Sequence, residues 1–203
     1  MINIMLPSGD MKQFENSVNM FDIAKSISNS LAKKAIGARV DGKLVDMTYV
    51  VEKDAKVELV TPETEDGVEI IRHSTAHLMA QAVIRLFPGT KVSIGPSIDK
   101  GFYYDFECQS FTRDDLDAIE KEMKKIIKKG AKIERFTKSR EEAIAFFKEK
   151  NEPYKVELIE DLPEDAEISF YSQGEWVDLC AGPHLMSTKG MKAFKLLSSS
   201  EAY

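Results

Sequence analysis

Two histidines one helical turn apart constrain the fold of this chain more than any other feature of its sequence. His73 and His77 stand in HSTAHLMAQAVIRLF, where apolar residues recur at intervals typical of an amphipathic helix. Positions i and i+4 of a helix share one face, so both imidazoles are expected to point the same way. The pair therefore predicts a helix that carries two imidazoles side by side.

A second pair with the same spacing, Cys180 and His184, lies far downstream in DLCAGPH. The Gly-Pro dipeptide inside it predicts a turn that swings His184 back over Cys180. Four such donors in two pairs suit either a tetrahedral zinc site or a metal-free hydrolytic pocket, and the spacing leaves both open. The pattern uses all three histidines of the chain, which argues against coincidence.

The composition indicates a globular protein without a membrane segment. The chain has 203 residues, 43% of them hydrophobic, enough for one large domain or two small ones. It lacks the run of about 20 apolar residues that a membrane span needs, and MINIMLPSGD has no features of a signal peptide. Two cysteines, Cys108 and Cys180, are too few for a disulfide framework and favour a reducing cytoplasm.

The net charge of −6 does not indicate a general nucleic-acid binder. The average conceals one basic run, however, which contains Lys121, Lys124, Lys125, Lys128, Lys129, Lys132 and Arg135. We interpret these lysines first as a solvated helix face paired with Glu120 and Glu122. Contact with an RNA backbone is the alternative, since an acidic protein can bind a polyanion through one local positive face.

Residues 1–61 are predicted to form a small α+β domain. A hairpin turning at residues 8–10 is followed by a helix over residues 21–34. Two short strands around Asp41-Gly42 and a last strand in KVELVT complete it. The polar segment 62–67 is turn-rich and predicts the domain boundary.

Residues 62–203 are predicted to form a larger α+β domain with a mainly antiparallel sheet. The helix with the two histidines ends near Phe87, and a capped helix runs from Thr112 to Gly130. Pro153 is expected to break the chain before YKVELIEDL. The expected strands are VSIGPSI paired with GFYYDFEC, AKIERFT, the hairpin EISFYSQGEWVDLC and a final strand AFKLLSSS, with a further helix in SREEAIAFFKEK.

Several segments resemble the N-terminal half of bacterial threonyl-tRNA synthetases: HSTAHLMAQAV, IGPSIDKGFYYDF, NEPYK, and WVDLCAGPH followed by AFKLLS. Residues 1–61 are similar to the TGS domain of that family, a ubiquitin-like β-grasp module. Residues 62–203 resemble its editing domain, which removes serine mischarged onto threonine tRNA. The paired HxxxH and CxxxH motifs also resemble the editing domain of alanyl-tRNA synthetase and its free-standing relatives, but GFYYDF, NEPYK and the TGS-like unit favour the threonyl family.

The resemblance implies a fragment of a cytoplasmic enzyme. Nothing in the chain resembles the catalytic core in which the family uses ATP and zinc, so we expect no activation of threonine. The expected partners are the acceptor end of threonine tRNA carrying serine, with no membrane, and the remainder of a synthetase chain that forms a homodimer. Two residues depart from the family pattern: Ala181 stands where arginine is common, and Glu201 where glycine is common.

An editing site is needed because a binding pocket discriminates poorly between serine and threonine. Threonine exceeds serine by one methyl group, which a pocket discriminates by only about 1–3 kcal/mol, so a second hydrolytic site must remove the wrong ester. Ester hydrolysis needs an oriented water, a proton acceptor and stabilisation of the oxyanion. By resemblance, His73 is expected to act as the base or to orient the water, with His77 assisting.

The resemblance assigns roles to six further residues. Lys155 is expected to donate to the leaving oxygen or the oxyanion, and Asp178 to hold the substrate ammonium or to orient a histidine. Cys180 and His184 are expected to shape a pocket that admits serine. Tyr103 and Tyr104 alternate along a strand, so one of them is expected to face the site and stack on the terminal adenine.

Metal-free chemistry is the expectation from the threonyl resemblance. Zinc held by His73, His77, Cys180 and His184 is the alternative that the alanyl resemblance implies. Two other functions compete with an editing fragment: a free-standing zinc-dependent deacylase of the alanyl type, and an RNA-binding module without turnover.

Overall fold

The computed structural model describes residues 1–201, which form two compact units. The first unit consists of residues 1–71 together with 182–186, and the second of 72–181 together with the chain from 187 onward. Helix α3 (Glu65–Leu86) contributes its first turns to the first unit and the remainder to the second. The division into domains at residue 61 stays a prediction. None of the helices in residues 1–201 is both long and apolar enough to cross a membrane.

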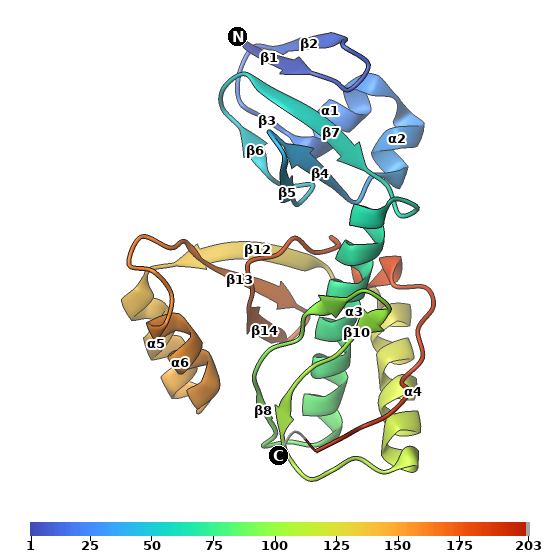
Figure 1. Ribbon diagram of the computed structural model, residues 1–203, viewed down its shortest axis with the longest axis vertical. Helices are drawn as coiled ribbons and strands as arrows, with labels where there is room; N and C mark the ends of the chain where they lie inside the picture. The colour runs from blue at the N-terminus through green and yellow to red at the C-terminus, as the bar shows by residue number, and fades with distance from the viewer. Residues whose placement is uncertain (202–203) are drawn as a thin grey trace. The chain divides into compact units, whose positions relative to one another are not determined.

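The first unit is a β-grasp-like fold, as predicted (Figure 1). Its five-stranded sheet has the order β2-β1-β7-β4-β5, in which β1 and β7 pair in parallel and the other neighbours are antiparallel. Two further strands, β3 and β6, form a separate pair. The strands are β1 (Ile2–Met5), β2 (Met11–Phe14), β3 (Val18–Asn19), β4 (Gly37–Val40), β5 (Lys43–Val45), β6 (Val50–Val51) and β7 (Ala55–Val60).

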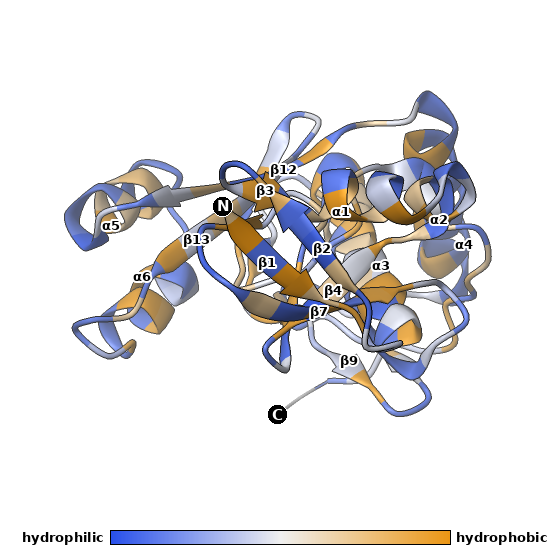
Figure 2. Cartoon of the chain, turned by 90° about the horizontal axis from the view of Figure 1, so that it is seen from above, coloured by the Kyte–Doolittle hydropathy of each residue, from blue (hydrophilic) through white to orange (hydrophobic). Residues whose placement is uncertain are grey.

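The helix predicted over residues 21–34 is two helices, α1 (Met20–Ile27) and α2 (Asn29–Lys34). Ser28 separates them because its backbone is extended, with φ −164° and ψ 153°, and its side chain accepts a hydrogen bond from the N–H of Leu31. A serine oxygen at this position satisfies an N–H that the first turn leaves open. Met20 and Ile23 of α1 pack into the buried core of the unit, and Figure 2 shows both hydrophobic and hydrophilic residues on this helix.

Helix α3 begins inside the segment 62–67, so the prediction of turns was wrong for residues 65–67. The hydroxyl of Thr64 accepts a hydrogen bond from the N–H of Gly67 and so caps the helix. Glu65 and Asp66 then place negative charge in the first turn, where the helix dipole favours it. A Cβ at Gly67 would lie 2.0 Å from the carbonyl oxygen of Thr61, so this glycine serves close packing.

The second unit is mainly antiparallel, as predicted. Its largest sheet has the order β12-β13-β14, and two small pairs join β8 to β11 and β9 to β10. Phe147 and Phe170 are buried where helix α5 covers the three-stranded sheet. The elements are β8 (Lys91–Val92), β9 (Ser97–Ile98), β10 (Gly101–Phe102), β11 (Phe106–Glu107), α4 (Arg113–Lys129), β12 (Ile133–Lys138), α5 (Arg140–Glu149), α6 (Pro153–Glu160), β13 (Ile168–Gln173), β14 (Trp176–Leu179) and the 3-10 turn η1 (Thr188–Gly190).

Helix α4 starts and ends where the sequence predicts. Thr112 and Asp115 form a reciprocal capping box, and Gly130 ends the helix in the left-handed conformation with φ 74°. Pro153 does more than break the chain, because it occupies the first turn of α6, where its missing N–H costs nothing.

The strand predicted in AFKLLSSS is absent from the described part of that segment. Its backbone finds a side-chain partner instead of a neighbouring strand, since the N–H of Leu196 donates to Glu120 over 2.8 Å. Lys195 pairs with the same carboxylate at 3.1 Å. The segment therefore contacts α4 without pairing to a strand.

Candidate functional site

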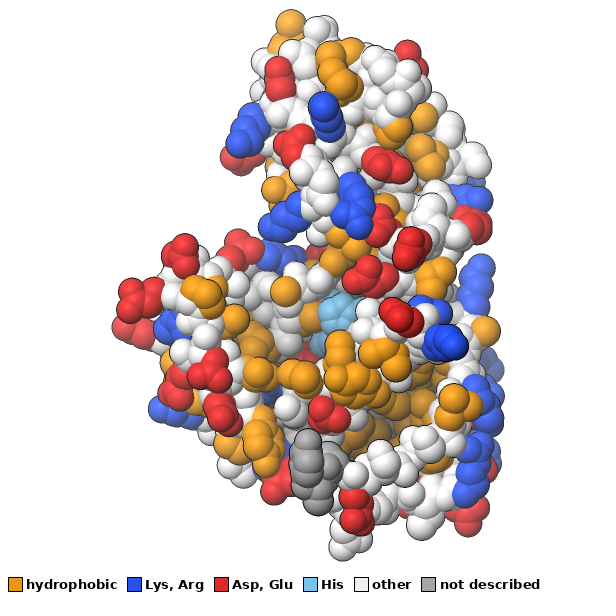
Figure 3. Space-filling view, viewed as in Figure 1, with side chains coloured by type: hydrophobic (Ala, Val, Ile, Leu, Met, Phe, Trp, Pro, Cys, Tyr) orange, Lys and Arg blue, Asp and Glu red, His pale blue; other side chains and the backbone are white. Residues whose placement is uncertain are grey.

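The two histidines lie together on α3, as their spacing predicts. The ring centroids of His73 and His77 are 5.1 Å apart with a T-shaped arrangement. His77 is buried and His73 is partly exposed. Ala76 and Ala80, on the same helix, pack against β8 and Tyr104 and so fix the helix in the unit. All three histidines of the chain belong to the predicted site, so the pale-blue surface in Figure 3 marks part of it.

Cys180 joins the two histidines in the second unit. Its Sγ lies 3.3 Å from Nε2 of His73, and the possible ligand atoms of His73, His77 and Cys180 all lie within 4.8 Å of one another. The residue follows β14 directly, and its N–H donates to the carbonyl of Ser169 over 3.1 Å. The structure thus brings together three of the four residues in the predicted pattern.

Asp178 on β14 lies beside these residues with every acceptor position of its carboxylate occupied. Oδ1 is 2.7 Å from Nζ of Lys155 and 2.8 Å from the N–H of Leu179. Oδ2 is 3.1 Å from Nδ1 of His77 and accepts from the hydroxyl of Tyr104 over 2.7 Å. A carboxylate offers about four lone-pair positions. In this structure the carboxylate of Asp178 therefore contacts His77, and partners within the chain take up all of its acceptor positions.

Lys155 reaches this carboxylate from α6. Asn151, with φ 53°, and Pro153 at the start of α6 turn the NEPYK segment so that the lysine points inward. Its Nζ donates to the carbonyl of Ser93 over 2.5 Å and to the hydroxyl of Tyr104 over 3.0 Å, in addition to Asp178. An ammonium has three donors, so Lys155 has none left for a leaving oxygen in this arrangement.

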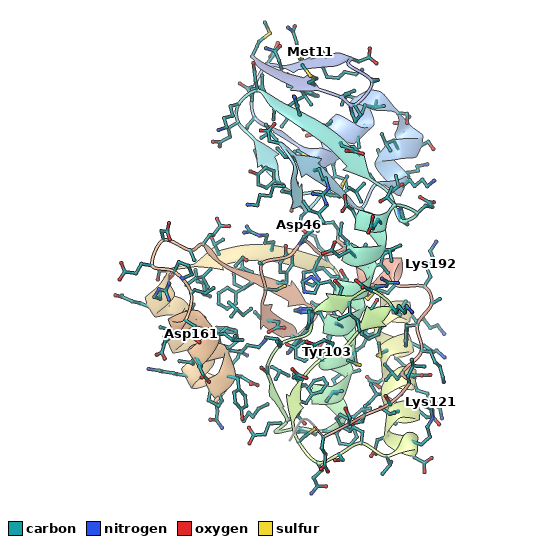
Figure 4. All side chains as sticks on the ribbon, viewed as in Figure 1. Met11, Asp46, Tyr103, Lys121, Asp161 and Lys192 are labelled. Carbon is teal, nitrogen blue, oxygen red and sulfur yellow. The ribbon has the colours of Figure 1, made fainter. Side chains whose placement is uncertain are left out.

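Tyr103 and Tyr104 differ in their surroundings. Tyr104 is buried, and its ring stacks on Phe106 at a centroid distance of 5.0 Å and an angle of 21°. Tyr103, labelled in Figure 4, is 40% exposed. Of the two, Tyr103 is the ring that is accessible for stacking, whereas Tyr104 belongs to the hydrogen-bonded group around Asp178.

Two family models and several curated proteins match this chain. Residues 2–61 match the family model of the TGS domain. Residues 168–202 match that of the threonyl and alanyl tRNA synthetase second additional domain. The threonine–tRNA ligase of Caldanaerobacter subterraneus is 55% identical over 201 residues, which is 98% of this chain and 31% of that protein. The enzyme of Clostridium kluyveri is 55% identical over 204 residues, covering 100% of this chain and 32% of that protein.

The chain is homologous to the N-terminal region of bacterial threonine–tRNA ligases. It spans about a third of the length of these relatives. The resemblance drawn from the sequence motifs is thereby confirmed. The second family model also covers Asp178, Cys180 and His184.

His184 is the fourth possible ligand in this homologous region. It lies in the segment 182–186 of the first unit, where its N–H donates to Oδ1 of Asp46 over 2.7 Å. The peptide bond between Gly182 and Pro183, just before it, is cis. That the imidazole of His184 completes the set of four stays a prediction.

Burial and charge act in opposite directions on the ionisable groups of the site. Burial raises the pKa of Asp178, but the charges of Lys155 and His77 outweigh it and hold that pKa well below its usual range. Burial also lowers the pKa of His77, yet the negative charges of Cys180 and Asp178 raise it to about 9. Burial, followed by the charge of Asp178, raises the pKa of Tyr104 well above its ordinary value.

Two residues that support the site were missed by the sequence analysis. Trp176, the single tryptophan of the chain, lies 5.7 Å from His77 between ring centroids. Gly95 faces the ring of Tyr104 so closely that a Cβ there would lie 2.0 Å from it. The available signal for Trp176 was its position in the hairpin before Asp178, and the signal for Gly95 was the Gly-Pro dipeptide inside the expected strand VSIGPSI.

Proposed function

We propose that this chain hydrolyses the ester that joins serine to mischarged threonine tRNA. The observation that carries the proposal is the group of His73, His77 and Cys180 beside the buried carboxylate of Asp178. It lies in a chain homologous to threonine–tRNA ligases, with a matching second additional domain. Two imidazoles and an oriented carboxylate are the groups that acid–base hydrolysis of an ester requires.

The two histidines have different roles in the proposed reaction. His77 donates Nδ1–H to Asp178, and a pKa of about 9 keeps it protonated at neutral pH. A cation is a poor base but a good partner for a developing oxyanion. His73 is partly exposed and is therefore the residue that orients water and accepts its proton. Water oxygen attacks the ester carbonyl carbon, the bond to the ribose oxygen breaks, and that oxygen takes a proton as serine leaves.

Lys155, Asp178 and Tyr104 are positioning residues in this proposal. Their mutual hydrogen bonds fix the carboxylate that holds His77 in one orientation. Tyr103 is the ring proposed to stack on the terminal adenine, because it is exposed. Cys180 and His184 are proposed to shape the pocket that admits serine and crowds the methyl group of threonine.

Zinc-dependent hydrolysis is the second candidate, and the donor set of the site favours it specifically. Sulfur and imidazole nitrogen are preferred zinc ligands, and the carboxylate on Nδ1 of His77 is a common partner of a metal-bound histidine. His73, His77, Cys180 and His184 are the residues that would hold the ion, which would lower the pKa of a bound water. Dialysis against a chelator, followed by addition of zinc, distinguishes the two candidates through ester hydrolysis.

The proposed substrate, location and assembly rest on the relatives named as threonine–tRNA ligases. The proposed substrate is the acceptor end of threonine tRNA carrying serine, and the proposed location is the cytoplasm. ATP and the zinc of an aminoacylation core are not proposed for these residues. A dimer formed through the remainder of a synthetase chain is a further proposal.

The test is to incubate the purified chain with threonine tRNA charged with serine or with threonine. Rapid loss of the serine ester with threonine spared supports the proposal. If neither ester is lost faster than in buffer, the chain is either a binding module or an impaired hydrolase. Ala181→Arg separates these two cases, because restored hydrolysis is expected only for an impaired hydrolase.

A further inference from the structure

A groove outside the candidate site lies between α4 and the segment after η1. It has a volume of about 360 Å³, and the apolar residues of its lining include Ile127 and Phe194. Four lysines line it, which are Lys124, Lys128, Lys189 and Lys192. Its lining contains no carboxylate. We refer to this feature as the lysine groove.

The lysines of the groove have no ion-pair partner among the acids of α4. We expected the helix lysines to pair with Glu120 and Glu122, but Glu120 contacts Lys195 at 3.1 Å. Glu122 contacts Arg85 at 3.1 Å and, more distantly, Lys125 at 3.6 Å. Within residues 1–201, none of the four groove lysines forms an ion pair. Their charge is therefore available to a ligand.

The two walls of the groove are held together firmly. The N–H of Thr188 donates to the carbonyl of Ala131 over 3.0 Å, and its hydroxyl donates to Ile126 over 3.3 Å. Met191 is almost completely buried, with 1% exposed. A Cβ at Gly130 would lie 2.3 Å from Cε of Lys189, so the stem of that lysine crosses the end of α4.

The positive charge extends beyond the groove along the exposed face of α4. Lys121, Lys125 and Lys129 continue it at helical spacing, and all three are exposed. Figure 3 shows Lys and Arg side chains gathered along the edge where Figure 1 places α4, and Figure 4 labels Lys121 and Lys192 there. Such an extended, one-signed surface suits a polyanion better than a single small anion.

We propose that the lysine groove binds the sugar-phosphate backbone of RNA. The chain as a whole carries a net charge of −6 and repels nucleic acid, so affinity must come from a local positive surface. The choice of RNA over an acidic peptide rests on the proposed function, in which the substrate is a tRNA. Phosphates contact the lysines, and the apolar residues of the lining accommodate a sugar.

The test measures the Kd of uncharged threonine tRNA by fluorescence anisotropy over a series of salt concentrations. Lys124→Glu/Lys128→Glu is compared with Lys148→Glu/Lys150→Glu, which changes two exposed lysines at the end of α5. Each pair changes the net charge by 2 × −2, from −6 to −10, so both variants carry the same overall charge. Lys189→Glu/Lys192→Glu tests the other wall.

We expect both groove variants to weaken tRNA binding by about tenfold or more, with a salt slope lower by about 0.9 for each lost phosphate contact. The control is expected to stay within about twofold of wild type. Equal weakening in the control, unchanged binding in the groove variants, or no binding by wild type overturns the proposal. So does competition by polyglutamate as effective as that by RNA.

Two additional measurements separate a loss of tRNA binding from unfolding and from a failure of the proposed hydrolysis. Lys124→Gln/Lys128→Gln removes the charges with a good helix former and shows whether a loss of binding follows from unfolding. Cleavage of a seryl ester on a short copy of the tRNA 3′ end reports on the catalytic site without the groove. If the chain cleaves the ester but the groove variants bind tRNA like wild type, only the groove proposal is rejected. If the chain does not cleave the ester but the groove variants bind tRNA more weakly, only the proposed hydrolase function is rejected.

Discussion

Nζ of Lys155 lies 2.7 Å from Oδ1 of Asp178, and both side chains are nearly inaccessible to solvent, at 3% and 2% exposed. A buried charge that loses its partner costs about 3–5 kcal/mol, whereas replacing both members by apolar residues is often neutral. The pair connects α6 to β14 and also sets the orientation of His77. Stability and the candidate chemistry therefore depend on the same contact.

Asp178→Asn is expected to lower the free energy of unfolding by about 3–5 kcal/mol, because Lys155 is left buried without a counter-charge. Urea denaturation measures the change. The matched comparison is the double variant Asp178→Leu with Lys155→Met, which is expected to lose less stability than Asp178→Asn alone. If the double variant is as unstable as Asp178→Asn, the unpaired charge of Lys155 is not the cause of the lost stability.

The stability of the protein is expected to decrease as the pH rises from about 6.5 to about 9. The pKa of His77 is raised from 6.5 to about 9 in the folded chain, so the folded state binds a proton more tightly than the unfolded state. This contribution, about 3 kcal/mol at 1.36 kcal/mol per pKa unit, is complete below pH 6.5 and is lost as the pH passes 9. The Tm of wild type and of His77→Asn across this range checks it, since the variant should lack this dependence.

His73→Ala is expected to reduce hydrolysis of the seryl ester by about 10²–10⁴-fold, the usual contribution of a positioned acid–base group. The Tm should change little, because His73 is partly exposed. Single-turnover ester loss and thermal unfolding measure the two effects separately. Hydrolysis at the wild-type rate would remove His73 from the mechanism.

Gly95→Ala is expected to displace Tyr104 and to destabilise the protein by about 1–3 kcal/mol, as overpacking of a core does. The added methyl group would lie 2.0 Å from the ring of Tyr104, whose hydroxyl contacts Asp178. Gly101→Ala is the control in the same hairpin, because nothing lies within 4 Å of a Cβ there. Tm and ester hydrolysis should both fall for Gly95→Ala and stay unchanged for Gly101→Ala.

The local structure of this chain could be predicted from sequence wherever neighbouring residues decide it. The capping box of Thr112 and Asp115, the left-handed Gly130 and the histidine spacing on α3 depend on contacts within a few residues. The absence of the strand predicted in AFKLLSSS could not be foreseen, because Glu120 of α4 supplies the partner for the N–H of Leu196. The break at Ser28 was missed because Ile27 and Leu31, on either side of it, keep the four-residue spacing of a continuous helix.

The sequence by itself therefore determined the fold class and the residues of the candidate site, since periodicity, capping and motif spacing are local or pairwise patterns. Only the tertiary structure showed which groups Lys155, Asp178 and Tyr104 contact. The donors of Lys155 and the acceptors of Asp178 are all taken up by partners from other parts of the chain. The spacing of residues in the sequence does not predict these contacts. Burial of Lys155, Asp178 and Tyr104 strengthens these hydrogen bonds, which is why we propose that the three residues position His77.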